Sequence, residues 1–354
     1  MELPRELELI AAACRAAYDH QAPLPSFEDV NAGRLLRFAR FHRVQGLVWR
    51  GIRDRRTDLS ADIAEALAAD AAEIAAANLR STAECRKLKQ LFDEAGIPLL
   101  FVKGLTLAVL AYGDAWSKSA VDIDIQVAPV DLLRAAELLM QGGYALISPA
   151  NPAALPAAHR WGKESSWVNA GTAAQVDLHT RLSDNRRLIP AIGLQSPQQS
   201  ITIVDGVSLP TLADEHLFAY LAVHGASSAW FRLKWVTDLA AFVHSRSAVE
   251  LTTLYSRSQE LGAGRAAAQA LLLADRFYGS LADCSGLKRS LRADSRSVWL
   301  YRQALRQLVG SGEPVEPTSM RGGTLRIHLT QFFLLPGMAF KASELLRQAR
   351  AAGA

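Results

Sequence analysis

The spacing of apolar residues changes twice along this chain of 354 residues. Up to about residue 95, and again after about residue 211, apolar positions recur at the spacing of one helix face. Between these regions, short apolar runs alternate with helix-length segments, as in a sheet covered by helices. We therefore predict an α+β fold in which helical regions precede and follow a mixed sheet.

The same pattern divides the chain into four parts. We expect an N-terminal helical region over 1–95, a core over 96–210, a helical domain over 211–310, and a linker with a final helix over 311–354. The expected flanking helices are 6–20, 31–53, 60–95, 214–227, 231–244, 248–261 and 264–278. The final helix is hydrophobic with a basic end; we expect it to dock on its own domain, with a membrane surface or a partner as alternatives.

The core alternates strands and helices. The expected strands are 98–102, 121–127, 144–147, 166–169 and 174–179, and the expected helices are 105–112 and 129–141. Pro129 suits a first helical turn, and Gly142 with Gly143 ends that helix. The segment 148–165 is rich in Pro, Ala and Asn, and we expect it to form a loop over the site.

Two aspartates mark the second of these strands. On a strand, residues two apart share a face, so Asp122 and Asp124 are expected to lie together while their apolar neighbours point to the other side. Two such carboxylates repel each other unless a cation lies between them. A divalent metal with oxygen ligands fits this pattern. A solvated strand end is the alternative, and the strongly apolar flanks favour the metal site.

A third carboxylate stands on the last strand of the core. Gln175, Asp177 and His179 alternate there with Val176 and Leu178. If this strand pairs beside the one that carries the two aspartates, three carboxylates converge. The sequence does not decide whether the strands pair.

Composition and charge narrow the class of protein. Half of the residues are hydrophobic, which permits a large core. The formal net charge is +4, but the basic residues are scattered, so a nucleic-acid partner is not implied. The three cysteines are far apart in sequence, which fits a reducing compartment, and no apolar run reaches membrane-spanning length. We expect a cytoplasmic protein without a transmembrane segment.

The order of these motifs resembles a known superfamily. A Lys-Gly pair opens a helix, an Asp-x-Asp strand follows about twenty residues later, a Gly-Tyr follows the next helix, and a Val-Asp-Leu-His strand comes last. This order resembles the nucleotidyltransferases of the DNA polymerase β type, and most closely the bacterial family labelled uncharacterised nucleotidyltransferase. The segment 216–241 is similar to the helical part that follows the core in that family. The resemblance extends from about residue 80 onward.

The resemblance implies a reaction and a metal. Asp122 and Asp124 match the paired aspartates that hold Mg²⁺ or Mn²⁺, and Asp177 matches the third, which helps to activate the attacking hydroxyl. The implied reaction moves a nucleoside monophosphate from a nucleoside triphosphate such as ATP to an acceptor and releases pyrophosphate. The acceptor would be a hydroxyl or phosphate of a small molecule, a peptide or a protein.

The resemblance also implies nucleotide-binding residues. Lys103 and Gly104 stand where the superfamily has Gly-Ser, and glycine at a helix start lets the backbone approach a phosphate. Leu105 replaces the serine, and Lys103 or Thr106 would have to compensate. Lys118 stands where relatives carry arginine and could neutralise triphosphate charge, with a solvated loop lysine as the alternative. His179 could orient Asp177 or contact substrate, with a structural histidine as the alternative.

Two other functions remain open. A catalytically silent module of the same fold could bind nucleotide or a partner, as an antitoxin-like regulator would. A helical accessory protein of a biosynthetic cluster could bind a peptide precursor. His224, Arg232, Lys234 and Asp238 could line an acceptor or base pocket, although pairing of Arg232 or Lys234 with Asp238 at helical spacing favours ion pairs between packed helices.

Overall fold

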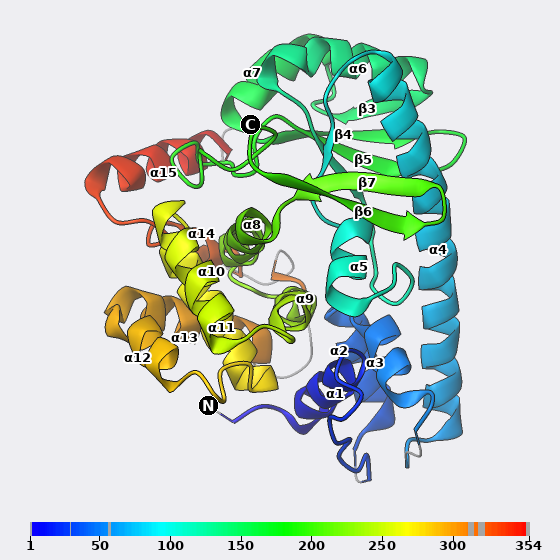
Figure 1. The fold of residues 1–354 in the computed structure, drawn as a ribbon, viewed down its shortest axis with the longest axis vertical. Coiled ribbons are helices and arrows are strands. Elements are labelled where there is room, and N and C mark those ends of the chain that lie inside the picture. Colours follow the sequence, from blue (N-terminus) through cyan, green and yellow to red (C-terminus); the bar gives the residue numbers. More distant parts are fainter. Residues whose placement is uncertain (1, 29, 56–57, 311–314, 318–322, 352–354) are drawn as a thin grey trace.

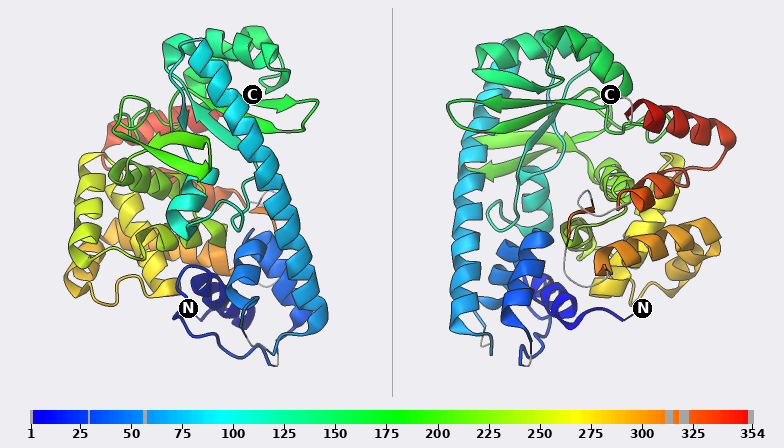
Figure 2. Two further views of the ribbon diagram at one scale, coloured as in Figure 1. Left: turned by 45° about the vertical axis from the view of Figure 1, so that its right-hand side comes forward. Right: turned by 180° about the vertical axis from the view of Figure 1, so that it is seen from behind.

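The long helix α4 (Ala61–Glu94) runs beside both the N-terminal helices and the part of the molecule that contains the β-sheets (Figure 1). The computed structural model describes every residue except 1, 29, 56–57, 311–314, 318–322 and 352–354. At one end α4 contacts α2 (Ala32–Phe41) and α3 (Gln45–Ile52), and at the other it contacts the elements around the sheet. Figure 2 shows this arrangement from two further sides. The prediction of one helix over 60–95 is confirmed.

The helix predicted over 31–53 is instead two helices, α2 and α3. The chain turns between them at Arg43, whose φ is 55°. This turn lets α3 pack closely against α1 (Arg5–Ala16). At the contact, a Cβ atom on Gly51 would lie 1.9 Å from the carbonyl oxygen of Ala13, so only glycine permits the approach. Tertiary packing therefore breaks a segment whose helical periodicity is continuous.

The central sheet has five strands in the order β1-β2-β5-β4-β3. They are β1 (Leu100–Phe101), β2 (Ile123–Gln126), β3 (Tyr144–Ser148), β4 (Glu164–Asn169) and β5 (Gln175–His179). β2 and β5 are parallel, and the other pairs are antiparallel, so the predicted mixed sheet is confirmed. β1 and β2 are shorter than predicted. Asp122 consequently lies in a bend just before β2 and not on the strand itself.

The helices of the core pack around this sheet. α5 (Leu105–Tyr112) has the predicted bounds, and α6 (Leu132–Gln141) follows a short 3-10 turn, η1 (Pro129–Asp131). The segment 148–165, predicted to be a loop, contains the 3-10 turn η2 (Pro152–Ala154) and α7 (Leu155–Trp161), and its end enters β4. Pro152 and Pro156 fall in the first turns of these elements, where proline is tolerated, so the proline-rich composition misled the prediction.

A second, two-stranded sheet was not predicted. β6 (Gln198–Val204) and β7 (Val207–Leu212) form a hairpin whose β7 contacts β1. Gly206 adopts a φ of 77° in its turn, and alternate residues such as Ile203 and Leu209 are buried with the core. Period-two alternation on either side of Asp205-Gly206 was the available signal for this hairpin.

Helices follow the hairpin, as predicted. They are α8 (Asp214–Ser227), α9 (Leu233–Val243), α10 (Ala248–Glu260), α11 (Gly264–Tyr278), α12 (Ser285–Ala293), α13 (Ser295–Val309), α14 (Leu325–Gln331) and α15 (Met338–Ala351). The first four agree with the four helices predicted over 214–278. The single final helix predicted after the linker is instead two helices, α14 and α15, with Pro336 and Gly337 between them. The last helix docks on its own chain as expected, because Glu344 accepts a hydrogen bond from Asn185 at 2.8 Å and pairs with Arg347. Most of the linker predicted over 311–323, and the end of the basic tail, lie outside the described residues.

Buried apolar side chains form two clusters. The larger one joins α1, α2 and α3 to the helices from α8 onward. The smaller one lies between the sheet, α4, α6 and the hairpin. α5 stands where the two clusters meet, with contacts to both β6 and α9. None of the helices in the described part of the chain is long and apolar enough to cross a bilayer.

Candidate functional site

Three carboxylates converge where β2 and β5 run side by side. The parallel register places Asp124 directly opposite Asp177, and the bend before β2 adds Asp122. One oxygen from each of the three lies within 4.8 Å of the others. Asp122 and Asp124 lie close together, as predicted. The reason given for this, alternation along one strand, was wrong, because Asp122 lies in the bend before β2.

Lys103 is the cation between two of these carboxylates. Its Nζ atom lies 2.5 Å from Oδ2 of Asp124 and 3.5 Å from Oδ1 of Asp122. Burial alone lowers the pKa of Lys103, but Asp124 and Asp122 hold that pKa well above its ordinary value. Burial alone raises the pKa of Asp124, but Lys103 and His179 hold it well below the usual range. Lys103 and His179 therefore hold the buried carboxylate of Asp124 in its ionised form.

His179 faces Asp124 from β5. Its Nε2 atom lies 3.0 Å from Oδ1 of Asp124 and 3.3 Å from Oε2 of Glu164. The sequence suggested that His179 could orient Asp177 or contact substrate, with a structural histidine as the alternative. Its contacts are with Asp124 and Glu164. Glu164 was not singled out from the sequence, because it falls in the segment predicted as a loop. Its alternation with Ser166 at the start of β4 was the signal that could have found it.

Asp177 differs from Asp124 in its surroundings. It accepts a hydrogen bond from Oγ of Ser166 at 2.7 Å, and no lysine or arginine of the described chain forms an ion pair with it. Burial raises the pKa of Asp177 and the hydrogen bond from Ser166 opposes this, while the charges of Glu164, Asp124 and Asp122 raise it further. The carboxylate of Asp177 is thus more basic than that of Asp124.

Gly104 begins α5 beside the carboxylates. Its φ of 73° and ψ of −120° suit only glycine. The space beside its α-carbon is open: a Cβ added there would lie 3.9 Å from the carbonyl oxygen of Asp122. Thr106 does not replace the missing serine, because it is fully buried and its hydroxyl lies against Thr211 and the carbonyl of Lys103.

Lys118 is neither solvated nor free. It is 5% exposed, and its Nζ atom lies 3.5 Å from Oδ2 of Asp238 on α9. The loop that carries it is fixed from α4, where Nδ2 of Asn78 donates to the carbonyls of Ala115 and Lys118, both at 2.7 Å. Asp238 also accepts a hydrogen bond from the hydroxyl of Tyr112 at 2.8 Å. The solvated-lysine alternative is therefore wrong.

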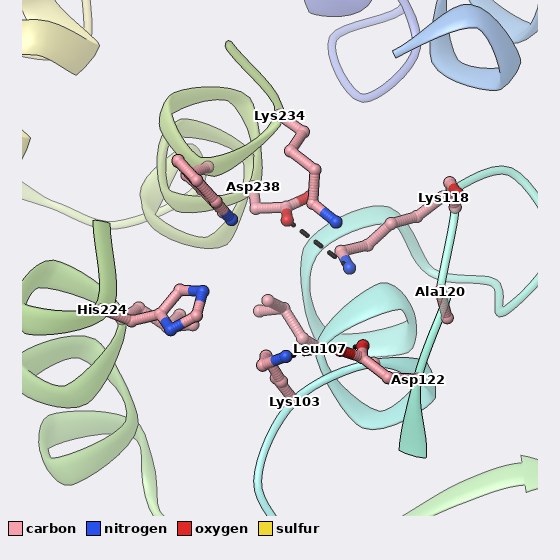
Figure 3. A pocket seen from close by; sticks show the side chains of 12 residues that line it. Lys103, Leu107, Lys118, Ala120, Asp122, His224, Lys234 and Asp238 are labelled. Atoms are coloured by element: carbon pink, nitrogen blue, oxygen red, sulfur yellow. Dashed lines mark ion pairs between the residues drawn. The ribbon is translucent and has the colours of Figure 1, made fainter. Parts of the chain in front are cut away.

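A pocket of about 450 Å³, part of it open to solvent, joins these residues to the helical region. Figure 3 shows Lys103, Lys118 and Lys234 directed into it around Asp122 and Asp238. Its lining residues are Lys103, Gly104, Leu107, Lys118, Ser119, Ala120, Asp122, Leu221, His224, Lys234, Trp235 and Asp238.

Arg232 lies apart from this pocket and bonds to the carbonyl of Phe41 and to Glu316. The ion pair expected from Asp238 to Arg232 or Lys234 is not formed; Asp238 pairs with Lys118.

Two groups of side chains present donor atoms that could hold a metal ion. One is Asp122, Asp124 and Asp177, and the other is Asp124, Glu164 and His179. The first offers only carboxylate oxygens, which hard divalent cations prefer. In the second, His179 already bridges the two carboxylates by hydrogen-bond distances.

Comparison with known proteins places the chain in a family. No curated protein is detectably similar to the chain. The model of one protein family, described as uncharacterised nucleotidyltransferase, matches residues 28–279, which is well over half of the chain and includes all the residues of the site above. The chain belongs to this family of uncharacterised nucleotidyltransferases.

Proposed function

We propose that the protein is a metal-dependent nucleotidyltransferase. It would move a nucleoside monophosphate from a nucleoside triphosphate to a hydroxyl or phosphate of a small molecule, a peptide or a protein. The observation that carries this proposal is the convergence of Asp122, Asp124 and Asp177 beside the glycine that begins α5. Carboxylates next to free helix-end amides suit a substrate that combines phosphates with a divalent cation.

The donor set fits Mg²⁺ or Mn²⁺. Three carboxylate oxygens lie close together, and one of them, on Asp124, stays ionised at any ordinary pH. Asp122, Asp124 and Asp177 would hold the ion, which when bound supplies charge neutralisation for the phosphate oxygens. His179 would keep the carboxylate of Asp124 in position through its hydrogen bond.

The remaining residues bind substrate and move a proton. The amides at the start of α5 and the ammonium groups of Lys103 and Lys118 would face the phosphates. A bond forms between the acceptor oxygen and the α-phosphorus while the bond from that phosphorus to pyrophosphate breaks. Asp177, whose pKa is raised, would accept the proton of an attacking hydroxyl and pass it to solvent.

Two observations favour a second function, which is nucleotide binding without turnover. Lys103 already neutralises Asp124, and Leu105 stands in place of the serine of the superfamily. In such a protein the carboxylates would stabilise the fold through their ion pairs with Lys103, and no metal would be needed. The free, buried cysteines support a reducing location such as the cytoplasm for either function.

The test is a transfer assay with an open choice of acceptor. Purified protein is incubated with each of the four nucleoside triphosphates and Mg²⁺ or Mn²⁺ in a cell lysate, and mass spectrometry is used to search for nucleoside monophosphate adducts. We expect adducts with the wild type and none with Asp122→Asn or Asp124→Asn. Adducts that persist in both variants would show that the site is misassigned. Triphosphate binding without any adduct would favour the silent module.

A further inference from the structure

The pocket beside the acidic cluster carries an excess of positive charge. Three of its lining residues are lysines and two are aspartates, and they come from segments that are far apart in the chain. Asp122 belongs to both the pocket and the acidic cluster, and Lys103 lines the pocket and forms ion pairs with the cluster. The two sites are therefore continuous, and one ligand can span them.

Lys234 is presented by a firmly held part of the helical region. It lies in the first turn of α9, where the backbone nitrogen of Leu233 donates to Nδ1 of His42 at 3.1 Å and that of Lys234 donates to the carbonyl of His42 at 3.3 Å. These bonds satisfy helix-end donors that would otherwise seek water or a ligand. One turn further on, Asp238 is fixed by Tyr112. The Lys234 side chain thus projects into the pocket from a rigid support (Figure 3).

The charge of Lys234 has no direct counterpart in the pocket. The nearest carboxylate of α9, on Asp238, pairs with Lys118, and within the described chain no carboxylate forms an ion pair with Lys234. Burial lowers the pKa of Lys234 to about 7, and the charge of Lys118 contributes in the same direction. Lys118 and Lys234 are neighbouring cations, and among the described residues only Lys118 of the two forms an ion pair, so this part of the pocket lacks negative charge. An anion between Lys118 and Lys234 would relieve their repulsion.

An anion can reach these lysines from solvent. The pocket has a volume of about 450 Å³, part of which is open to solvent. The lysine side chains that line it are long and flexible, so they can adjust to a ligand while the backbone that carries them stays in place.

Resting on the nucleotidyltransferase function proposed above, we propose that this pocket binds the β- and γ-phosphates of the nucleoside triphosphate, with Lys118 and Lys234 as their cationic partners. The α-phosphate then lies towards Asp122 and the acidic cluster. Lys234 is the residue by which the helical region recognises polyphosphate and holds the pyrophosphate that leaves. A nucleoside monophosphate does not reach it.

The test compares ligands that contain or lack a polyphosphate. Isothermal titration calorimetry with Mg²⁺ present measures the binding of inorganic pyrophosphate, of each nucleoside triphosphate and of the matching monophosphates. Lys234→Gln is expected to weaken the binding of pyrophosphate and triphosphate by about tenfold or more, the worth of one charged hydrogen bond, and to leave monophosphate binding within about twofold. Lys234→Arg retains the charge and most of the affinity. The control Lys87→Gln removes an exposed lysine on α4 and is expected to leave the affinities for pyrophosphate, triphosphates and monophosphates unchanged.

The outcomes separate this inference from the function on which it rests. Unchanged pyrophosphate affinity in Lys234→Gln overturns the pocket assignment, even if the lysate assay detects transfer. An equal loss of monophosphate and pyrophosphate binding overturns it as well, because Lys234 would then contact another part of the nucleotide. Selective loss of polyphosphate binding supports the pocket, even if the lysate assay detects no transfer. In that case the catalytic proposal fails and the binding site stands.

Discussion

The acidic cluster and the lysine pocket are neighbours with opposite charge imbalance. The cluster has three aspartates around one lysine, Lys103, and the pocket has three lysines around two aspartates. The cluster lacks positive charge and suits a divalent cation, whereas the pocket lacks negative charge and suits a phosphate chain. A metal-bound polyphosphate satisfies both at once, since it presents a cation at one end and anionic oxygens at the other.

The two sites also differ in how they are built. The cluster is formed by two adjacent parallel strands and the bend that leads into one of them. The pocket needs the start of α5, the loop fixed by Asn78, and two helices from beyond residue 213. A site on one sheet can form with the core alone. The pocket forms only when the helical region is docked against α5.

The largest effect is expected for Asp124→Asn. This substitution leaves the buried ammonium of Lys103 without its closest partner, and breaking a buried ion pair costs about 3–5 kcal/mol. We expect urea unfolding, followed by circular dichroism, to show a loss of about 3 kcal/mol together with loss of nucleotide transfer. The matched control is Asp122→Asn. Oδ1 of Asp122 lies 3.5 Å from Nζ of Lys103 and its side chain is more exposed, so the loss of stability should stay below about 1 kcal/mol. Equal costs for both variants would contradict the distinction between a buried and an open carboxylate.

The next largest effect tests the pocket. Lys118→Gln removes the ion-pair partner of the buried carboxylate of Asp238, which keeps its hydrogen bond from Tyr112, so we expect a loss of about 2–3 kcal/mol in urea unfolding. The double variant Lys118→Gln, Asp238→Asn removes both charges. It should recover part of the loss, which a double-mutant cycle measures as a coupling energy. Strictly additive losses would mean that the two charges do not interact.

A smaller effect is expected where the two sites meet. Gly104→Ala puts a side chain on a residue with a φ of 73° and a ψ of −120°, which costs about 1–3 kcal/mol. No atom other than the carbonyl oxygen of Asp122, at 3.9 Å, is within 4 Å of the added Cβ, so the loss measured by thermal unfolding reports backbone strain rather than a clash. Gly286→Ala is the control: it also adds a Cβ in open space, but Gly286 has no positive φ and lies in α12, so the change should be neutral or stabilise by up to about 1 kcal/mol.

The smallest effect concerns pH. Because burial and the neighbouring carboxylates raise the pKa of Asp177, a proton competes with the metal there more strongly than at an ordinary aspartate. Mn²⁺ affinity should therefore fall as the pH drops through that raised pKa, by at most about tenfold per pH unit, and level off above it. Electron paramagnetic resonance of free Mn²⁺ measures this. Asp177→Asn should bind Mn²⁺ more weakly and with a flatter pH profile; an unchanged profile would remove Asp177 from the metal site.

The sequence predicted the cluster better than the pocket for a physical reason. Asp122, Asp124 and Asp177 lie within or beside short apolar runs, and strand periodicity gives their direction even though it does not give the pairing. The role predicted for Lys103 at a phosphate stays a prediction. Its ion pair with Asp124 was not foreseen, because the reach of a lysine side chain cannot be read from its position in the sequence. Glu164 was missed because prolines suggested a loop where a helix and a strand begin.

The pocket could be predicted only in part. His224, Lys234 and Asp238 stood out as polar residues in apolar helices, but helical spacing suggested that Lys234 pairs with Asp238. The actual partner of Asp238, Lys118, is 120 positions earlier in the chain, and only the docking of α9 on α5 brings the two together. The hairpin β6-β7 was missed although its alternation was visible.

The most direct test of the two-part site is a crystal structure of the protein with Mn²⁺ and a non-hydrolysable nucleoside triphosphate, with anomalous scattering used to locate the metal. We predict an anomalous peak among the carboxylates of Asp122, Asp124 and Asp177, and density for the β- and γ-phosphates between Lys118 and Lys234. A metal bound elsewhere, or a triphosphate whose terminal phosphates point away from α9, would contradict the account.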